Sequence, residues 1–450
     1  MADEFVPCEQ TPPERPAIDF YRWQEDWSVL ADLRIKREPG DELKYIPLWP
    51  GDPQSYLSFG ITSRERIETT NAALFGIAGN RSETYLLDRL ELHADLHLTD
   101  HFRLFAEIES AFAPGLANPN PVDSNPLDMR LLFLDMTGTF LDGEYKLRIG
   151  RQEIAFDLQR FVSVRDGPNV RQAYDAVWGD YEKGGWRLTG FLSQPVQYRN
   201  EMAFEDYSDK DFTFCGVRLQ RVLFEVSKLA LSFSDFHLDD VKFPAASGAE
   251  RRFSWDVHYF GAARGFDWDI EGVTQSGSIG EKRIDAWALG SLAGYSFAEV
   301  PWQPRFGLQL DAASGDRGHG NQTFGTFNPL FPNGYYVTLS GFTGYTNFIH
   351  VKPSLSLNPV KNVKVVGSLG ELWRQTTRDA VYVQPDVPVP GTAGQSGRRS
   401  STYGQLCIDW DVTRSLSVSL EYDHYEVAEV IRRAGGHDSD YLGVQFSWGW

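Results

Sequence analysis

Charged side chains recur at every second position in several stretches of this chain. Within residues 85–98, leucine or alanine alternates with arginine, glutamate, histidine and aspartate. Guanidinium groups bind carboxylates through paired hydrogen bonds, so a row of arginines can offer an anionic solute successive weak sites. The same groups can instead form a ladder of cross-strand ion pairs that only keeps a wet surface rigid. Both readings stay open for the candidate residues of this polar face, which are Arg64, Arg66, Arg89, Glu91, His93, Asp95, Arg103, Glu107, Arg148, Arg187, Arg218, Asp256, His258, Asp269, Asp311, His350 and Lys352.

Motifs for catalysis or for a cofactor are absent from the sequence. We find no Gly-x-Ser-x-Gly elbow, no Cys or His pair at metal-ligand spacing and no phosphate-binding loop. We therefore expect no enzyme activity, no cofactor, no metal site and no nucleic-acid partner. The net charge of −19 argues against a simple anion receptor, although loops that never meet a solute contribute to it.

The elements that carry the polar face are predicted to be membrane-crossing β-strands. Alternation at period two places all apolar side chains on one face of a strand and all polar ones on the other. The last ten residues, 441–450 (YLGVQFSWGW), alternate without a break and end on an aromatic. This segment resembles the terminal strand of a bacterial outer-membrane β-barrel. We expect Phe446, Trp448 and Trp450 to be read by the assembly machinery of such barrels.

The chain divides into about 18 strand candidates whose lengths suit tilted strands crossing a bilayer. Tight links, such as residues 99–100, 183–185 and 413–414, are expected to alternate strictly with long ones, such as 157–172, 239–250, 315–346 and 375–401. Short periplasmic turns alternating with long extracellular loops are typical of outer-membrane barrels. The candidates begin at residue 55 and run as 55–68, 85–98, 102–109, 127–138, 144–156, 173–182, 186–196, 212–223, 228–237, 252–264, 266–275, 282–297, 305–314, 347–357, 362–374, 402–412, 415–427 and 438–450.

Composition agrees with a barrel without proving it. The chain is 42% hydrophobic and 14% aromatic, with a mean hydropathy of −0.37. No apolar run approaches the roughly 18 residues that a spanning helix needs, so a helical membrane protein is excluded. We predict an all-β, monomeric barrel over residues 55–450 in the outer-membrane lipid, preceded by a periplasmic segment or plug over 1–54. A soluble β-sandwich is the remaining alternative.

The cysteines and the first residues carry little further information. Three widely spaced cysteines make no disulfide framework. Cys215 and Cys407 are expected to be lipid-facing or buried thiols, and Cys8 is a poor match to a lipoprotein processing site. The acidic start of the chain lacks the apolar core of a signal peptide.

Four stretches resemble the alginate export family of outer-membrane channels. They are residues 22–28 (RWQEDWS), 150–153 (GRQE), 164–171 (VRDGPNVR) and 325–331 (GTFNPLF), in an order that spans most of the chain. The resemblance implies an 18-stranded monomeric barrel and a founding activity of passing a polyuronate across the outer membrane. The acidic balance of this chain weakens a polyanion assignment.

The resemblance draws attention to two segments that the strand pattern leaves unexplained. Residues 161–171 carry Arg165, Asp166 and Arg171 around a Gly-Pro turn, and they form either a constriction hanging into the pore or an ordinary outer loop. Residues 18–28 form either a short amphipathic helix or a plug entering from the periplasm. The loop over 375–401 is rich in proline and glycine and is predicted to be mobile.

Three functional readings follow. The first is a passive channel for an anionic solute, a polyuronate such as alginate or a related anionic saccharide. The second is a porin for small organic or aromatic solutes, favoured if loops narrow the pore and the interior arginines are all paired. The third is a surface adhesin or structural barrel that conducts nothing.

Overall fold

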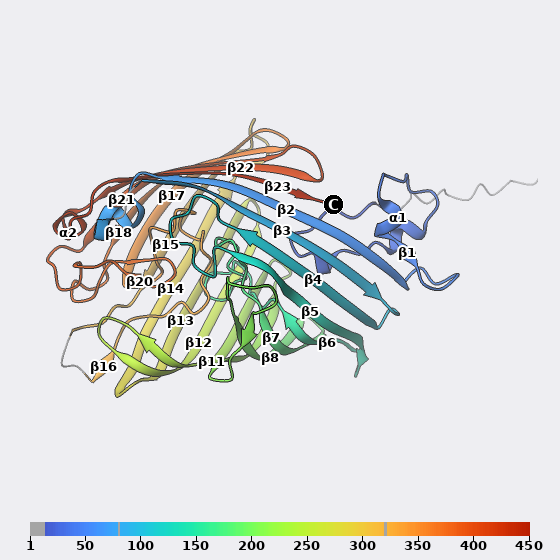
Figure 1. Cartoon of the computed structure of the whole chain (residues 1–450), viewed down its shortest axis with the longest axis horizontal. Coiled ribbons are helices and arrows are strands. Elements are labelled where there is room, and N and C mark those ends of the chain that lie inside the picture. Colours follow the sequence, from blue (N-terminus) through green and yellow to red (C-terminus); the bar gives the residue numbers. More distant parts are fainter. Residues whose placement is uncertain (1–13, 80–81, 319–321) are drawn as a thin grey trace, which may run out of the picture.

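The computed structural model describes residues 14–79, 82–318 and 322–450, and it is an antiparallel β-barrel of 18 long strands. Each strand pairs with its neighbours along the chain, and β2 (Tyr56–Thr70) pairs with β23 (Ser439–Gly449) to close the cylinder. Figure 1 shows α1 and β1 at the end of the barrel where the C label lies, with α2 and β16 at the opposite end. The predicted fold class and strand number are confirmed.

All 18 strand candidates become strands of the barrel, with ends that differ by a few residues. Short strands and helical turns occupy the connections: β1 (Ile46–Pro47), β9 (Tyr207–Ser208), β16 (Thr323–Phe324), β19 (Tyr382–Val383), β20 (Val387–Pro388), α1 (Asp41–Lys44), α2 (Glu429–Arg433) and the 3-10 turns Arg22–Gln24, Ser28–Ala31 and Ala73–Gly79. The remaining barrel strands are β3 (Glu83–His97), β4 (Phe102–Phe112), β5 (Asn125–Phe140), β6 (Gly143–Gln152), β7 (Tyr174–Lys183), β8 (Trp186–Gln197), β10 (Phe212–Leu223), β11 (Ser227–Lys242), β12 (Ser247–Ala263), β13 (Phe266–Ile279), β14 (Lys282–Ser296), β15 (Arg305–Ala313), β17 (Phe348–Val360), β18 (Val363–Trp373), β21 (Arg399–Asp411) and β22 (Leu416–Val427).

Alternation along the strands separates an apolar outer surface from a polar interior. On β3, Leu90 and Leu92 are exposed on the outside, whereas Arg89 and Glu91 are buried on the inside. An apolar belt on the outside suits lipid, and a polar interior suits water or solute. No helix among the described residues is long and apolar enough to span a bilayer.

The prediction that short and long links strictly alternate is wrong at two hairpins. β11 and β12 continue beyond the expected strand ends, and they pair around a bulge as far as Lys242 with Ser247. β13 and β14 likewise pair up to Ile279 and Lys282. The expected long loop over 239–250 is therefore an extended hairpin, because its residues continue the ladder of hydrogen bonds.

Local irregularities explain why the facing of residues 127–138 could not be read from the pattern. The register between β4 and β5 shifts at Glu107 and Ile108, so Arg130 and Leu131 are consecutive and both buried. A β-bulge places two residues of one strand opposite one of its partner, which breaks period two. The inward-facing positions of β5 change from even-numbered (Asp128, Arg130) to odd-numbered (Leu131, Phe133, Asp135) at this point.

Several loops fold into the barrel and pack around its interior. Phe161, Phe327, Tyr345 and other side chains from residues 153–173 and 314–347 belong to the largest hydrophobic cluster. Arg374 donates to the carbonyls of Thr377, Asp379, Thr392, Gln395 and Gly397, which ties together the loop that was predicted to be mobile.

The three cysteines differ in their surroundings. Cys215 lies on the outer face of β10, between the inward-facing Phe214 and Gly216, and Cys407 lies on the inner face of β21, where its Sγ is 3.5 Å from Glu421 Oε2. Cys8 falls outside the described residues, and so does the start of the chain.

Candidate functional site

The interior of the barrel contains the residues that the sequence analysis placed on the polar face. Arg103, Asp256 and Lys352 are partly buried, and Arg187 is exposed at the end of the barrel where the tight turns lie. The other thirteen are buried: Arg64, Arg66, Arg89, Glu91, His93, Asp95, Glu107, Arg148, Arg218, His258, Asp269, Asp311 and His350.

Arginines of β2 and β3 hold a loop inside the barrel, residues 153–173, which we call the inward loop. Arg64 Nη1 donates to the carbonyl oxygen of Asp166 at 2.7 Å, and Arg89 Nη2 donates to Asp166 Oδ1 at 2.6 Å. Arg66 donates to the carbonyl of Gly167. Burial alone would raise the pKa of Asp166, but Arg89 and Arg64 outweigh it and lower that pKa well below its usual value. The three guanidinium groups therefore bind the loop.

A second cluster fixes the start of the inward loop to β12 and β13. His258 lies between two carboxylates, with Nδ1 at 2.9 Å from Asp157 Oδ2 and Nε2 at 2.8 Å from Asp269 Oδ2. Arg218 pairs with Asp157, and Arg160 Nη2 donates to Asp269 Oδ1 at 2.9 Å. Asp157 and Arg160 belong to the loop, so both of its flanks are tied to the wall.

Between these two clusters lies a buried group of glutamates and arginines. Arg130 Nη1 donates to Glu153 Oε1 at 2.7 Å, and Arg130 also pairs with Glu107. Arg171 pairs with the same Glu153 and lies 3.5 Å from Glu91 Oε1. Since a buried charge without a partner is strongly unfavourable, this mutual pairing stabilises the fold of the interior.

Three further arginines of the predicted polar face also have partners. Arg103 Nε donates to Asp95 Oδ1 at 2.6 Å, and Arg148 makes two hydrogen bonds with Asp135 at 2.6 and 2.7 Å. Arg187 lies 2.8 Å from Asp180 Oδ1.

On the opposite wall, His350 joins β15, β17 and β21. His350 lies 2.9 Å from both Asp311 Oδ2 and the Tyr403 hydroxyl, and Lys352 Nζ donates to the carbonyl of Val337 at 2.8 Å. Five predicted wall residues have a buried side-chain atom without a hydrogen bond within the described chain: Arg64 Nε, Arg89 Nε, Glu91 Oε1, His93 Nδ1 and Asp256 Oδ2.

Arg165 differs from these arginines. Its guanidinium has no hydrogen bond and no ion pair with any residue that the structure describes, and its side chain is partly exposed. Burial lowers the pKa of Arg165, while Tyr198, Tyr174 and Asp386 act in the opposite direction. Its φ of 51° lies in the left-handed region, a strained conformation for an arginine that is often found at functional sites.

Two of the stretches that carried the family resemblance meet inside the barrel. Ser163 N donates to the carbonyl of Phe331 at 3.0 Å, and Phe331 N donates to the carbonyl of Phe161 at 3.0 Å. A Cβ added to Gly167 would lie 3.0 Å from the Cα of Gly334, so the two loops touch through their backbones. Residues 161–171 and 325–334 therefore contact each other inside the barrel, and whether they constrict a pore stays a prediction.

The N-terminal residues 18–27, which we call the strap, also enter the barrel. They contain a 3-10 turn at Arg22–Gln24 and no α-helix. Trp23 lies beneath the guanidinium of Arg148, with 4.1 Å between Cζ and the ring centre, and Phe20 lies 4.3 Å from Cζ of Arg171. Of the two predictions for this segment, the amphipathic helix is wrong.

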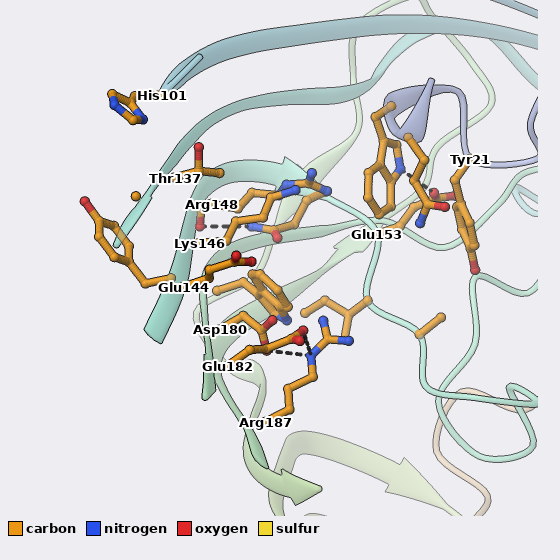
Figure 2. Close-up of a pocket in the computed structure, with 18 of the residues that line it drawn as sticks. Tyr21, His101, Thr137, Glu144, Lys146, Arg148, Glu153, Asp180, Glu182 and Arg187 are labelled. Atoms are coloured by element: carbon orange, nitrogen blue, oxygen red, sulfur yellow. Dashed lines mark hydrogen bonds and ion pairs between the residues drawn. The ribbon is translucent and has the colours of Figure 1, made fainter. Parts of the chain in front are cut away.

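Cavities remain on both sides of the strap. The larger one has a volume of about 700 Å³ and is lined by strap residues, by Lys146 and Arg148, and by acidic residues of β6 and β7. Figure 2 shows Glu144, Asp180 and Glu182 on one side of this cavity, with Tyr21 and Glu153 across from them. A smaller cavity of about 270 Å³ is lined by Arg64, Arg89, Arg171 and Asp166, among others.

Several residues of the site were not found from the sequence. Arg130 was hidden by the bulge in β5, and Asp157 and Arg160 lie in a loop, where no periodicity indicates facing. Trp23 belongs to the stretch 22–28 that carries the family resemblance, but no pattern there predicts its contact with Arg148. Among the residues that the structure describes, no group of three or more His, Cys, Asp or Glu side chains is placed to hold a metal ion.

A family model described as alginate export matches residues 55–445. The chain belongs to the alginate export family. It is therefore an outer-membrane β-barrel channel, and neither the family nor the similar solved structures are enzymes. No curated protein matches the chain in sequence.

Solved structures of outer-membrane proteins share the fold at low sequence identity. Acinetobacter baumannii OccAB4 is 8% identical with a TM-score of 0.59, covering 88% of this chain and 98% of its own. Pseudomonas aeruginosa OccK2 (OpdF), crystallised with glucuronate, is 12% identical with a TM-score of 0.55, covering 87% and 96%. Pseudomonas aeruginosa OpdK, crystallised with vanillate, is 12% identical with a TM-score of 0.53, covering 87% and 98%.

Proposed function

We propose that this channel passively carries small solutes that bear a carboxylate, of the size of a single uronate or an aromatic acid. The observation that supports the proposal is that most interior arginines are already bound by groups of the protein, whereas Arg165 is not. Arg64 and Arg89 bind the inward loop, and Arg171 pairs with Glu153 within it, which leaves Arg165 as a cation able to meet a passing carboxylate. A guanidinium in a site of low dielectric attracts a carboxylate more strongly than one in bulk water.

The size of the interior supports a small solute. A cavity of about 700 Å³ falls within the range of typical small-molecule sites. Carboxylates and basic groups both line it, so a solute would be held weakly and released quickly, as conduction requires. Glucuronate in OccK2 and vanillate in OpdK are solutes of this class, bound by proteins of the same fold. We further propose that the protein acts as a monomer and that Phe446, Trp448 and Trp450 serve barrel assembly.

Passage of a polyuronate is the second candidate, favoured by membership of the alginate export family. A polymer needs one continuous path lined by available cations. The pairing of the interior arginines and the loops within the barrel favour the small solute instead. The third candidate is a barrel that conducts nothing. It predicts no current from the folded protein in a bilayer.

The test is conductance of the purified protein in a planar bilayer under a salt gradient. We expect anion preference and block by glucuronate at least as strong as block by oligouronates of the same carboxylate concentration. Stronger block with increasing chain length would favour the polyuronate, and absence of current from folded protein would contradict both channel readings.

A variant isolates Arg165. Arg165→Gln is expected to move the reversal potential toward cations and to weaken block by glucuronate. The matched control is Arg187→Gln, because Arg187 lies on the polar face at the exposed tight-turn end and already pairs with Asp180 and Glu182. Equal effects of the two substitutions would mean that only net interior charge matters, and would contradict a specific role for Arg165.

A further inference from the structure

The strap enters the barrel at the seam where β2 and β23 close it. Arg22 makes the attachment: Nη2 donates to the carbonyl of Trp450 at 2.9 Å and Nη1 donates to the carbonyl of Ile61 at 3.0 Å. Its Nε donates to Glu25 Oε1 at 2.6 Å, and Arg22 is only 4% exposed. One buried side chain thus fixes the strap to both strands of the seam.

Beyond the seam, the strap reaches the inward loop. The carbonyl of Trp23 accepts a hydrogen bond from Arg103, and Trp23 Nε1 donates to Glu153 Oε2 at 3.3 Å. The hydroxyl of Tyr21 accepts a hydrogen bond from Gln159 Nε2 at 3.0 Å. A segment that comes from outside the tight-turn end of the barrel therefore contacts a loop that comes from the opposite end.

The strap separates the two cavities of the site. Its residues Ile18, Asp19 and Phe20 line the cavity of about 270 Å³ that contains Arg64 and Arg89. The residues that follow, Tyr21, Trp23 and Gln24, line the cavity of about 700 Å³. Consecutive residues of one segment face two different spaces, so the segment is the partition between them.

The strap is held in a way that permits release. No residue of 18–27 belongs to a strand of the barrel, and the main chain of the strap does not pair with the sheet. Its attachments are side-chain hydrogen bonds, ring contacts and the packing of Trp27 with Leu30, Ile35 and Tyr56, and these can break without opening the hydrogen-bond ladder of the barrel. Removing it would join the two cavities.

We propose that the strap is a periplasmic-side plug that closes the passage through the barrel when docked and opens it when displaced. The proposal rests on the proposed function, since a plug has meaning only in a barrel that conducts. Both cavities reach the tight-turn end of the barrel, where His101 lines the larger one and Thr413 and Arg414 line the smaller one, so the strap lies across the periplasmic mouth. Displacement of Arg22 from the seam frees the path to the periplasm.

A reversible lock tests the plug directly. An ideal Cβ at Gly449 lies 3.8 Å from Cβ of Ile18, which is about the mean Cβ separation of disulfides, ~3.8 Å. Ile18→Cys with Gly449→Cys, in a background with Cys8, Cys215 and Cys407 replaced by serine, should therefore form a disulfide that pins the strap. We expect low conductance in the oxidised protein and a severalfold rise after reduction. The single-cysteine variants are the controls and should not respond to reductant.

A second variant opens the plug. Arg22→Ala should raise the conductance severalfold, while Arg34→Ala, which removes a mostly exposed arginine of the same N-terminal region, should leave it unchanged. Retention of the heat-modifiable barrel on gels verifies folding. Equal conductance of the oxidised, reduced and Arg22→Ala proteins would overturn the plug and leave the channel intact. No current from any folded variant would overturn the proposed function itself, and the plug with it.

Discussion

The inward loop and the strap occupy the same interior but are held by different means. The loop is continuous with β6 and β7 at its two ends and is fixed by buried ion pairs on both flanks. The strap is attached at one end of the barrel, through Arg22 and a few contacts around Trp23. The attachments of the loop suit a fixed part of the barrel. Those of the strap suit a segment that can be displaced.

The interior arginines also differ in whether a solute could bind them. An arginine on an inner strand face can meet a solute only if no carboxylate or carbonyl of the protein already occupies its donors. The Nη donors of Arg64 and Arg89 bind Asp166 and its neighbours, whereas the guanidinium of Arg165 makes no hydrogen bond with a described residue. Counting interior arginines therefore overestimates the number of sites that a solute can use.

The largest effect is expected from Asp166, which holds the inward loop to two arginines of the wall and also pairs with Arg171 of the loop itself. Asp166→Asn removes the charge that Arg64, Arg89 and Arg171 share. Breaking a buried ion pair from one side typically destabilises a protein by about 3–5 kcal/mol. We expect a loss of that size in urea unfolding, together with higher conductance and stronger anion preference as the arginines become available.

The control for this substitution is Asp142→Asn, since Asp142 is almost fully exposed and pairs only distantly with Lys183. A stable Asp166→Asn protein with unchanged conductance would show that the inward loop does not depend on these arginines. The contrast between the loop and the strap would then fail.

A smaller effect is expected at the strap. Glu25 accepts hydrogen bonds from Arg22 Nε at 2.6 Å, from Trp27 Nε1 at 2.8 Å and from the backbone of Asp19 at 3.0 Å. Glu25→Gln keeps the shape and loses the charge, and hydrogen bonds to charged groups contribute about 1.5–3 kcal/mol. Faster cleavage of the N-terminal region by protease, with unchanged unfolding of the barrel, is the expected result. Loss of barrel stability instead would mean that the strap is part of the wall.

How far the sequence predicts this molecule depends on where periodicity exists. Strands over 85–98 and 441–450 could be assigned with their facing, because sheet geometry repeats every two residues. The bulge beside Arg130 interrupts the repeat, so the buried pairing of Arg130 with Glu153 could not be predicted. The inward placement of residues 161–171 depends on contacts with Arg64 and Arg89, about 80 to 100 positions away, and such long-range pairing leaves no local pattern.

The docking of the strap should depend on pH near neutrality. Lys44 lies between the rings of Trp27 and Trp450, 4.9 and 4.6 Å from their centres. Burial, and then the charge of Arg22, lower the pKa of Lys44 to about 7, against the smaller opposite effect of Glu25. An undocked Lys44 has a pKa of about 10.4, so between pH ~7 and ~10.4 the undocked form binds more protons and docking strengthens as pH rises.

We therefore expect higher conductance at about pH 6 than at about pH 9. Lys44→Met should abolish most of that difference, because it removes the titrating group but keeps a side chain of similar length. The inward loop should not respond in this range. The lowered pKa of Asp166 gives a stabilisation that is complete above the ordinary carboxyl pKa of about 3.9 and is lost only as pH falls below it. A conductance change that persists in Lys44→Met would contradict this assignment.

The smallest expected effect concerns the contact between loop and strap. Tyr21→Phe removes the hydroxyl that accepts a hydrogen bond from Gln159, and Gln159→Ala removes the donor. If the two parts are coupled, the double variant should lose less stability than the sum of the single variants, with a coupling energy of about 0.5–1.5 kcal/mol for one hydrogen bond. Additive effects on strap release would mean that the plug moves independently of the loop. A measured coupling would mean that release of the strap alters the stability of the inward loop at Gln159.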